Sequence, residues 1–169
     1  MKYTPEETET IGKVKNYLKA IRTLNKEKFS LELELKEDIP LPQSIKYSLE
    51  MPGGYSKSKG EQITSRMVKR NLIIKRLELF NKELDKFMPI LYLLNAGHRN
   101  ILAAFVLSRS YTEMLEILNE YCITESSYKR KFPEACLFVA KYLDLDNPPS
   151  LEKLNEKYFE IVQESEGEN

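Results

Sequence analysis

The stretch Ser110–Cys136, SYTEMLEILNEYCITESSYKRKFPEAC, predicts two short helices joined by a tight turn. Ser110 is followed three residues later by Glu113, a capping-box pattern that marks the start of a helix. After the turn Cys122–Thr124, the threonine is a good N-cap for a second helix, which we expect to run from Glu125 to about Leu143. Two short helices with this spacing are typical of a helix-turn-helix.

The second of these helices has two distinct faces. Its predicted inward face is made of Tyr128, Phe132, Ala135, Cys136 and Val139. Its outward residues, which are the candidate DNA-binding site, are Ser126, Ser127, Lys129, Arg130 and Lys131. A helix-turn-helix places the first turns of its second helix in the major groove. The alternative interpretation is the solvated basic face of an ordinary helix.

Different outward residues suit different contacts with DNA. Arg130 is the best candidate for a paired contact to guanine or for a phosphate clamp, because its guanidinium presents several donors in one plane. Lys129 and Lys131 would mainly neutralise phosphates, which gives salt-dependent affinity but little sequence information. The short serines Ser126 and Ser127 allow a close approach to the base edges.

Upstream of this stretch, the sequence predicts two long helices that pair as an antiparallel hairpin. The first extends from Thr4 to about Glu37, with an apolar stripe at Ile11, Val14, Leu18, Ile21 and Leu24. Its last part, FSLELELKED, alternates like a strand, but it lacks β-branched residues and is predicted to be helical. The second extends from Glu61 to about Phe87, with a stripe at Met67, Ile74, Leu77, Leu84 and Phe87. Pro89 is expected to bend or restart the chain, and Gly97 to stop a helix.

These expectations divide an all-α chain of 169 residues into five parts. They are an N-terminal long helix (1–37), a linker loop rich in Pro and Gly (38–60), a second long helix (61–95), a helix-turn-helix domain (96–146) and an acidic C-terminal tail (147–169). The last residues, QESEGEN, are predicted to be disordered because they are rich in Glu and poor in apolar residues.

Charge is balanced overall, with 26 cations and 26 anions, but it is unevenly distributed. Residues 56–82 carry eight cations and two anions, whereas residues 144–169 carry eight anions and two cations. A basic segment beside an acidic tail suits a nucleic-acid-binding protein that screens itself. It equally suits a helical protein whose two ends pair with each other.

Several classes of protein are disfavoured by the sequence. The two cysteines, Cys122 and Cys136, lack the spacing of a zinc site, and the single histidine, His98, stands outside any catalytic pattern. GGYSKSKG resembles a phosphate loop but lacks its Gly-Lys-Ser/Thr ending. Neither a signal peptide nor an apolar run of membrane-spanning length is present. We therefore expect a soluble, cytoplasmic protein that has no cofactor, no metal and no membrane association and is not an enzyme.

The residues Glu116–Thr124, EILNEYCIT, resemble the E-I-A-x-x-L-G-I-S spacing of sigma-factor-like helix-turn-helices. Taken with KVKNYLKAIRTLN, MPGG and YKRKFPEACLFVAKYL, the chain over about residues 8–145 is similar to the ArpU and RinA families of phage late transcriptional regulators. This resemblance implies binding near a phage promoter and activation of late genes through the host RNA polymerase. It also implies that Ser126, Ser127, Lys129 and Arg130 contact DNA.

The sequence departs from that family pattern at two positions, Cys122 and Leu118, and it also has Pro133 inside the second helix. Cys122 stands where Gly is expected, which is unfavourable if the turn requires a positive φ. Leu118 replaces a small Ala where the two helices cross, and Pro133 removes one backbone hydrogen bond from the second helix.

We therefore expect the protein to bind double-stranded DNA sequence-specifically and to activate transcription. Its expected partners are the host RNA polymerase and further copies of itself in a homo-oligomer. Two alternatives stay open. One is a phage packaging protein of the small-terminase type, which also joins a helix-turn-helix to a helical oligomerisation region. The other is a helical protein-interaction module that does not bind DNA.

Overall fold

Helices form nearly all of the part of the chain that the computed structural model describes, residues 2–37 and 59–167, and no strand occurs there. In chain order they are α1 (Pro5–Glu37), α2 (Lys59–Leu91), α3 (Ala96–Leu107), α4 (Tyr111–Glu120), α5 (Glu125–Val139), the 3₁₀ helix η1 (Ala140–Tyr142) and α6 (Leu151–Gly167). The all-α prediction is confirmed. The predicted linker lies outside the described residues as far as residue 58, and residues 59 and 60 begin α2.

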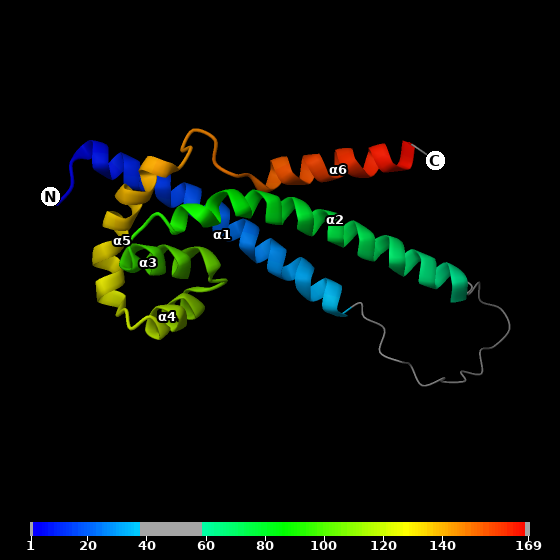
Figure 1. The fold of residues 1–169 in the computed structure, drawn as a ribbon, viewed down its shortest axis with the longest axis horizontal. Coiled ribbons are helices and arrows are strands. Elements are labelled where there is room, and N and C mark those ends of the chain that lie inside the picture. The colour runs from blue at the N-terminus through cyan, green and yellow to red at the C-terminus, as the bar shows by residue number, and fades with distance from the viewer. Residues whose placement is uncertain (1, 38–58, 168–169) are drawn as a thin grey trace.

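The two long helices α1 and α2 lie side by side and run in opposite directions (Figure 1). Thr4 begins α1 with a capping box, in which its Oγ1 accepts from the Glu7 N–H (3.2 Å) and its own N–H donates to the Glu7 carboxylate (2.8 Å). All five residues of the predicted α1 stripe are buried. The FSLELELKED segment is helical as far as Glu37, because Leu31 continues this stripe and is buried as well.

One expectation for α2 was wrong, and of the two effects expected of Pro89 a restart of the chain does not occur. Met67 was placed in the buried stripe, but 61% of it is exposed; the buried stripe is Ile73, Leu77, Phe80, Leu84, Phe87 and Leu91. The position of α1 explains the difference. The last turn of α1 ends at Glu37, and the ion pair between Glu34 and Lys69 (3.0 Å) shows that this end lies next to the start of α2 near Met67, so α1 does not extend far enough to bury Met67. The helix also continues through Pro89 to Leu91, where the next three N–H groups donate to carbonyls three residues earlier and close the last turn.

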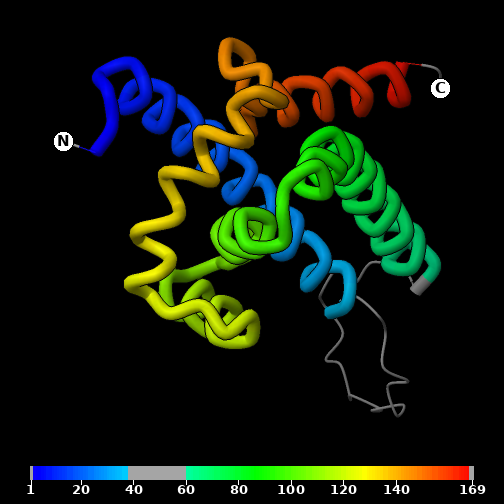
Figure 2. The backbone as a smooth tube through the Cα atoms, turned by 60° about the vertical axis from the view of Figure 1, so that its left-hand side comes forward, coloured from blue at the N-terminus to red at the C-terminus, as the bar shows by residue number. Residues whose placement is uncertain are grey.

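Helices α3, α4 and α5 pack together beside the first half of α1 (Figure 2). Gly97 does not stop a helix, because it lies in the first turn of α3. The preceding Asn95 is the N-cap, and its side chain accepts from the His98 N–H (2.9 Å). The second predicted helix is also shorter than expected, since α5 ends at Val139 and gives way to η1. It continues through Pro133.

The acidic C-terminal segment is not a disordered tail within the described residues, because 151–167 form α6. The prediction weighed the Glu content and overlooked Leu151, Leu154, Tyr158 and Ile161, which recur at helical spacing. Leu154 is buried, and the Asn155 side chain accepts from Arg76 of α2 (2.9 Å). Helix α6 therefore packs on α2 and runs antiparallel to it (Figure 1).

Buried side chains from all six α-helices form one contiguous core. Within it, α5 packs against both α1 and α3. All five predicted inward residues of α5 are buried, and the Phe132 ring lies 5.2 Å from that of Phe105 on α3. This packing fixes which face of α5 is left to solvent, and so it positions the candidate site.

Candidate nucleic-acid interface

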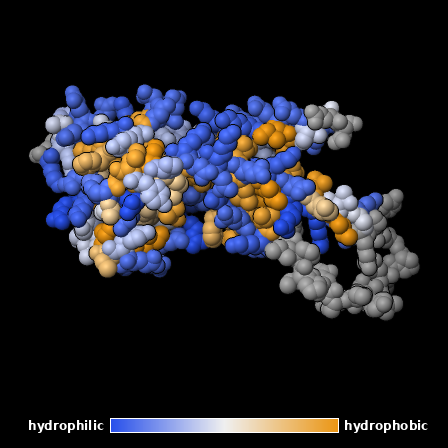
Figure 3. Space-filling model, in the orientation of Figure 1, coloured by the Kyte–Doolittle hydropathy of each residue, from blue (hydrophilic) through white to orange (hydrophobic). Residues whose placement is uncertain are grey.

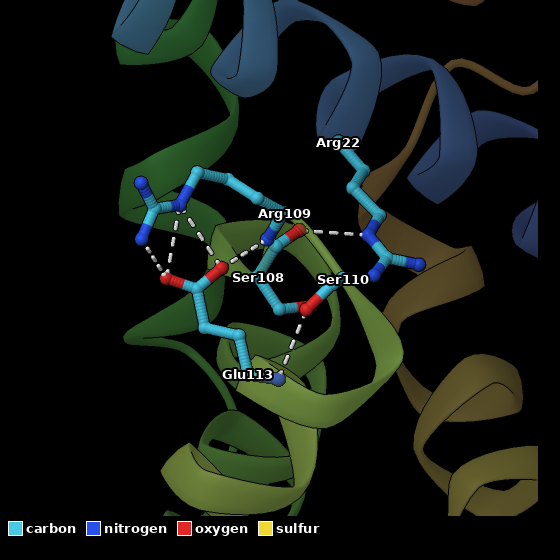
Figure 4. A network of polar contacts seen from close by, with 5 residues as sticks. All are labelled: Arg22, Ser108, Arg109, Ser110 and Glu113. Atoms are coloured by element: carbon cyan, nitrogen blue, oxygen red, sulfur yellow. Dashed lines mark hydrogen bonds and ion pairs between the residues drawn. The ribbon is translucent and has the colours of Figure 1, made fainter.

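The connection from α3 to α4 is held by a dense set of polar contacts (Figure 4). Arg22 of α1 donates through Nε to the Ser108 carbonyl (2.8 Å). Ser110 is the N-cap of α4, and its Oγ accepts from the Glu113 N–H (3.1 Å). Glu113 reaches back one residue past the cap, because its carboxylate accepts from the Arg109 N–H (2.5 Å) and from the Arg109 guanidinium (2.6 Å). The predicted cap is thus present, and it is reinforced by an ion pair.

The Glu113 carboxyl has a pKa lowered to about 2, mainly by its hydrogen bonds with the Arg109 side chain and then by the one from the Arg109 N–H. A carboxyl with a lowered pKa stabilises the fold at pH values above its unfolded pKa and loses that contribution as the pH falls. We predict that Glu113→Gln lowers the free energy of unfolding by about 1 kcal/mol at pH 7, because a neutral amide oxygen then replaces the carboxylate that pairs with the Arg109 guanidinium.

This difference between Glu113→Gln and the parent protein should shrink between about pH 4.5 and pH 2, when the parent carboxyl itself becomes protonated. Urea unfolding of both proteins across this pH range measures it. Glu116→Gln, at an exposed position of the same helix, is the control and should show little change at any pH. A difference that stays constant down to pH 2 would contradict the prediction.

The turn between α4 and α5 is closed by backbone hydrogen bonds of the Schellman type. The Ile123 N–H donates to the Leu118 carbonyl and the Cys122 N–H to the Asn119 carbonyl, both at 2.9 Å. Cys122 has φ 55°, the left-handed region that favours glycine. The turn therefore does require the positive φ that made Cys122 unfavourable on sequence grounds, and the chain accepts a strain of about 1 kcal/mol there.

The five candidate residues lie on the first two turns of α5. Thr124 caps this helix by accepting from the Ser127 N–H (3.2 Å). Four of the five residues are exposed, and Ser127 is half-buried beside the cap. Since Tyr128 and Phe132 are buried on the opposite side, Ser126 and Arg130 share one outward ridge at a four-residue spacing. The structure thus brings the predicted site residues together on one exposed surface.

The three cations of this surface differ in their surroundings. The Lys129 ammonium pairs with the Glu125 carboxylate (2.5 Å), which also accepts from the Tyr111 hydroxyl of α4 (2.6 Å). These contacts, with Lys129 the largest cause, lower the pKa of Glu125. Within residues 2–37 and 59–167, neither the Arg130 nor the Lys131 side chain forms a hydrogen bond or an ion pair. Lys2 is the main cause of the lowered pKa of Glu134, and Arg130 adds to it by its charge alone. Arg130 and Lys131 are therefore the groups best placed to meet an anionic partner.

The surroundings of α5 are less basic than the KRK run suggests. Residues 109–134 contain four cations and five anions: Arg109, Lys129, Arg130 and Lys131 against Glu113, Glu116, Glu120, Glu125 and Glu134. Three of these anions form ion pairs. Glu134 pairs with Lys2 (3.1 Å), Glu113 with Arg109, and Glu125 with Lys129. Exposed Glu116 and Glu120 make α4 unfavourable for phosphate, so positive charge is concentrated on the second turn of α5.

Sequence reasoning missed several residues that build this surface. Lys2 lies against α5 from the far end of the chain, and Arg22 stacks on Phe105 (5.2 Å) while holding the start of α4. Tyr111 links α4 to α5. The Thr4/Glu7 capping box was a detectable signal for the ordered start that places Lys2. Arg22 and Tyr111 carry no such signal, because their partners are far away in sequence.

The two cysteines and the possible metal ligands among the described residues form no site beside this surface. Cys122 and Cys136 are free thiols, and burial raises the pKa of the Cys136 thiol to about 12, so it stays protonated. Among the described residues, no cluster of His, Cys, Asp or Glu could hold a metal ion. None of the helices described is long and apolar enough to cross a membrane.

Comparisons of the chain with models of protein families, with curated proteins and with solved structures each gave no match.

Proposed function

We propose that the chain is a sequence-specific DNA-binding transcriptional regulator. In this proposal α1 and α2 form a long antiparallel hairpin, α4 and α5 form a sigma-factor-like helix-turn-helix, and α5 enters the major groove. The observation that carries the proposal is the surface of Ser126, Arg130 and Lys131 on the first turns of a capped helix whose opposite face is buried. The resemblance to phage late regulators extends it to activation of late genes with the host RNA polymerase.

The rigid support of α5 favours DNA binding over a merely solvated basic helix. Thr124 caps the helix, the Schellman turn fixes its start relative to α4, and Phe132 anchors its far face against α3. A helix held in this way keeps its outward side chains in register with the base edges at little entropic cost on binding. No catalytic group is needed for such a role.

The charge distribution defines how the interface would sit on DNA. Exposed Glu116 and Glu120 would repel phosphates, so the second turn of α5 comes nearest to the duplex and α4 stays further away. With Lys129, Arg130 and Lys131 as the phosphate-neutralising groups, the logarithm of the affinity should fall with the logarithm of the salt concentration with a slope of about −3 per protomer. This slope is shallow for a DNA-binding protein.

The first test is binding to labelled duplex DNA from the neighbourhood of its own gene, titrated against salt, with random duplex alongside. We expect one fragment to bind tightly. Arg130→Ala should weaken that binding at least about tenfold and reduce the salt slope by about 1. Arg130→Lys separates two roles, since it should restore the slope but not the sequence preference. Lys82→Ala, at an exposed position of α2, is the matched control and should bind like the parent.

Two results would overturn the proposal. Equal, weak binding to every duplex, unchanged in preference by Arg130→Lys, would indicate a non-specific surface and favour the packaging alternative. Absence of binding to all fragments even at low salt would leave α5 as the surface of a protein-interaction module.

A further inference from the structure

The beginning of α2 is exposed to solvent on all sides. Every one of the twelve residues from 60 to 71 is exposed. The segment nevertheless forms more than three helical turns, about 18 Å in length. Helices in proteins are stabilised mainly by packing of an apolar face, and short unpacked helices are marginal in water. This segment, which we call the distal segment, therefore lacks the packing that stabilises the rest of α2.

The distal segment also has apolar side chains that are exposed and that none of the described helices covers. Ile63, Met67 and Val68 are 59%, 61% and 54% exposed. Phe159 of α6, which extends toward the same end of the molecule, is 61% exposed. Figure 3 shows apolar side chains amid polar ones on the half of the molecule that holds α2 and α6. Exposed apolar groups that gather at one place mark an interaction surface.

Charges at this end are arranged in two blocks of opposite sign. The distal segment carries Arg66, Lys69 and Arg70 against a single anion, Glu61. The last three turns of α6, residues 158–167, carry Glu160, Glu164 and Glu166 and no cation. The α2 helix begins, and the α6 helix ends, at this same end of the molecule (Figure 1). Among the described residues, Arg66 and Arg70 nevertheless form no ion pair with these three glutamates. Arg66 and Arg70 on the distal segment, and the three glutamates on α6, are thus available to a partner of opposite charge, whereas Lys69 already pairs with Glu34 of α1.

We propose that a second copy of this chain covers the distal segment in a two-fold symmetric dimer. In such a dimer one patch meets the same patch of its partner, so the surface must be complementary to itself. A surface with a basic block that contains apolar side chains, and an acidic block on a neighbouring helix, meets that requirement. The basic distal segment of each copy faces the acidic end of the partner's α6, and Ile63, Met67 and Val68 are removed from water.

Nucleic acid is a less suitable occupant of this surface. Phosphates would be attracted by Arg66 and Arg70, but they would be repelled by the glutamates of α6 at the same end and would leave Met67 and Val68 exposed. The inference does not rest on the proposed function, because it concerns residues at the opposite end of the molecule from α5 (Figure 1).

The test is the mass of the full chain in solution, without DNA, by sedimentation equilibrium. The parent protein is expected at twice the chain mass at concentrations up to about 100 µM. Variant A, Arg66→Glu with Arg70→Glu, and variant B, Glu160→Lys with Glu164→Lys, should each be monomeric, because like charges then face each other. An equimolar mixture of A and B should form a heterodimer, since both contacts in it again join opposite charges.

This mixing experiment separates contacts between chains from contacts within one chain, because only the former can be restored by a second variant. All four substituted positions are exposed, and helical content by circular dichroism checks that both variants fold. Lys26→Glu with Lys82→Glu carries the same charge change as A at exposed sites elsewhere and should remain dimeric. Met67→Glu should be monomeric and should not be rescued by B.

Three outcomes would overturn the proposal. The first is a parent protein that stays monomeric over the whole concentration range. The second is a ring of many subunits, which would point to a different assembly. The third is that variant A keeps the mass of the parent protein but binds DNA more weakly. That result would show that the distal segment binds nucleic acid. Loss of DNA binding in Arg130→Ala with an unchanged dimer keeps the two proposals separate.

Discussion

Replacing Phe132 with Ala is expected to lower the free energy of unfolding by about 3–4 kcal/mol. The Phe132 ring is only 6% exposed and lies 5.1 Å from that of Tyr128 and 5.2 Å from that of Phe105. Because Phe105 belongs to α3 and the Lys15 ammonium of α1 lies 5.9 Å from the ring, the substitution leaves a cavity where three helices meet. Urea unfolding followed by circular dichroism measures the loss.

Phe138 provides a matched control for this prediction. It is the same residue type on the same helix but is 51% exposed, with its ring stacked on His98 at 4.9 Å. Phe138→Ala should cost less than about 1 kcal/mol, since little surface is newly exposed to water. Equal losses in the two variants would contradict the packing described for α5.

The Phe132 result also bears on the proposed DNA interface. If α5 is held in place mainly by its buried face, Phe132→Ala should weaken DNA binding through loss of the folded state. Arg130→Ala should weaken it with the melting temperature unchanged. Measuring stability and binding on both variants separates a residue that supports the surface from one that contacts DNA.

The local chemistry of the sequence was sufficient to predict the helices α1, α4 and α5. The caps at Ser110 and Thr124 and the inward face from Tyr128 to Val139 depend on neighbours within a few residues, which a sequence pattern contains. The same holds for the α1 stripe and for the helical state of FSLELELKED. A positive φ at Cys122 was raised only as a condition under which a non-Gly residue would be unfavourable, and the structure meets that condition with φ 55°.

The errors came from features that depend on distant partners. Met67 continues an apolar pattern, but among the described residues no helix buries it, because α1 ends at Glu37. Helix α6 was missed because its high Glu content suggested disorder, whereas its stability comes from packing on α2, more than 60 residues earlier in the chain. The ion pairs that neutralise much of the surface around α5, such as Lys2 with Glu134, are likewise invisible in a net charge.

Arg76 of α2 contacts both α6 and α1. Its guanidinium donates to the Asn155 side chain (2.9 Å) and pairs with Glu27 of α1 (3.4 Å). It also lies 5.8 Å from the ring centroids of both Phe80 and Tyr158. We predict that Arg76→Ala lowers the free energy of unfolding by about 2 kcal/mol, through the lost hydrogen bond, the lost ring contacts and the lost packing of its aliphatic stem.

Most of this loss should appear locally, as detachment of α6. Amide hydrogen exchange over residues 151–167 should become faster in Arg76→Ala, while exchange over α3 and α5 stays slow, since the polar and ring contacts of Arg76 are with α1, α2 and α6. Arg76→Lys should restore little, since an ammonium cannot lie flat between two rings while donating to Asn155. Lys82→Ala, an exposed cation on the same helix, should leave α6 protected.

Unchanged protection of α6 in Arg76→Ala would show that Leu154 and its apolar neighbours hold the helix without it. If instead α6 is released, its acidic end no longer has a fixed position, and the dimer proposed for the distal segment should weaken in the same variant.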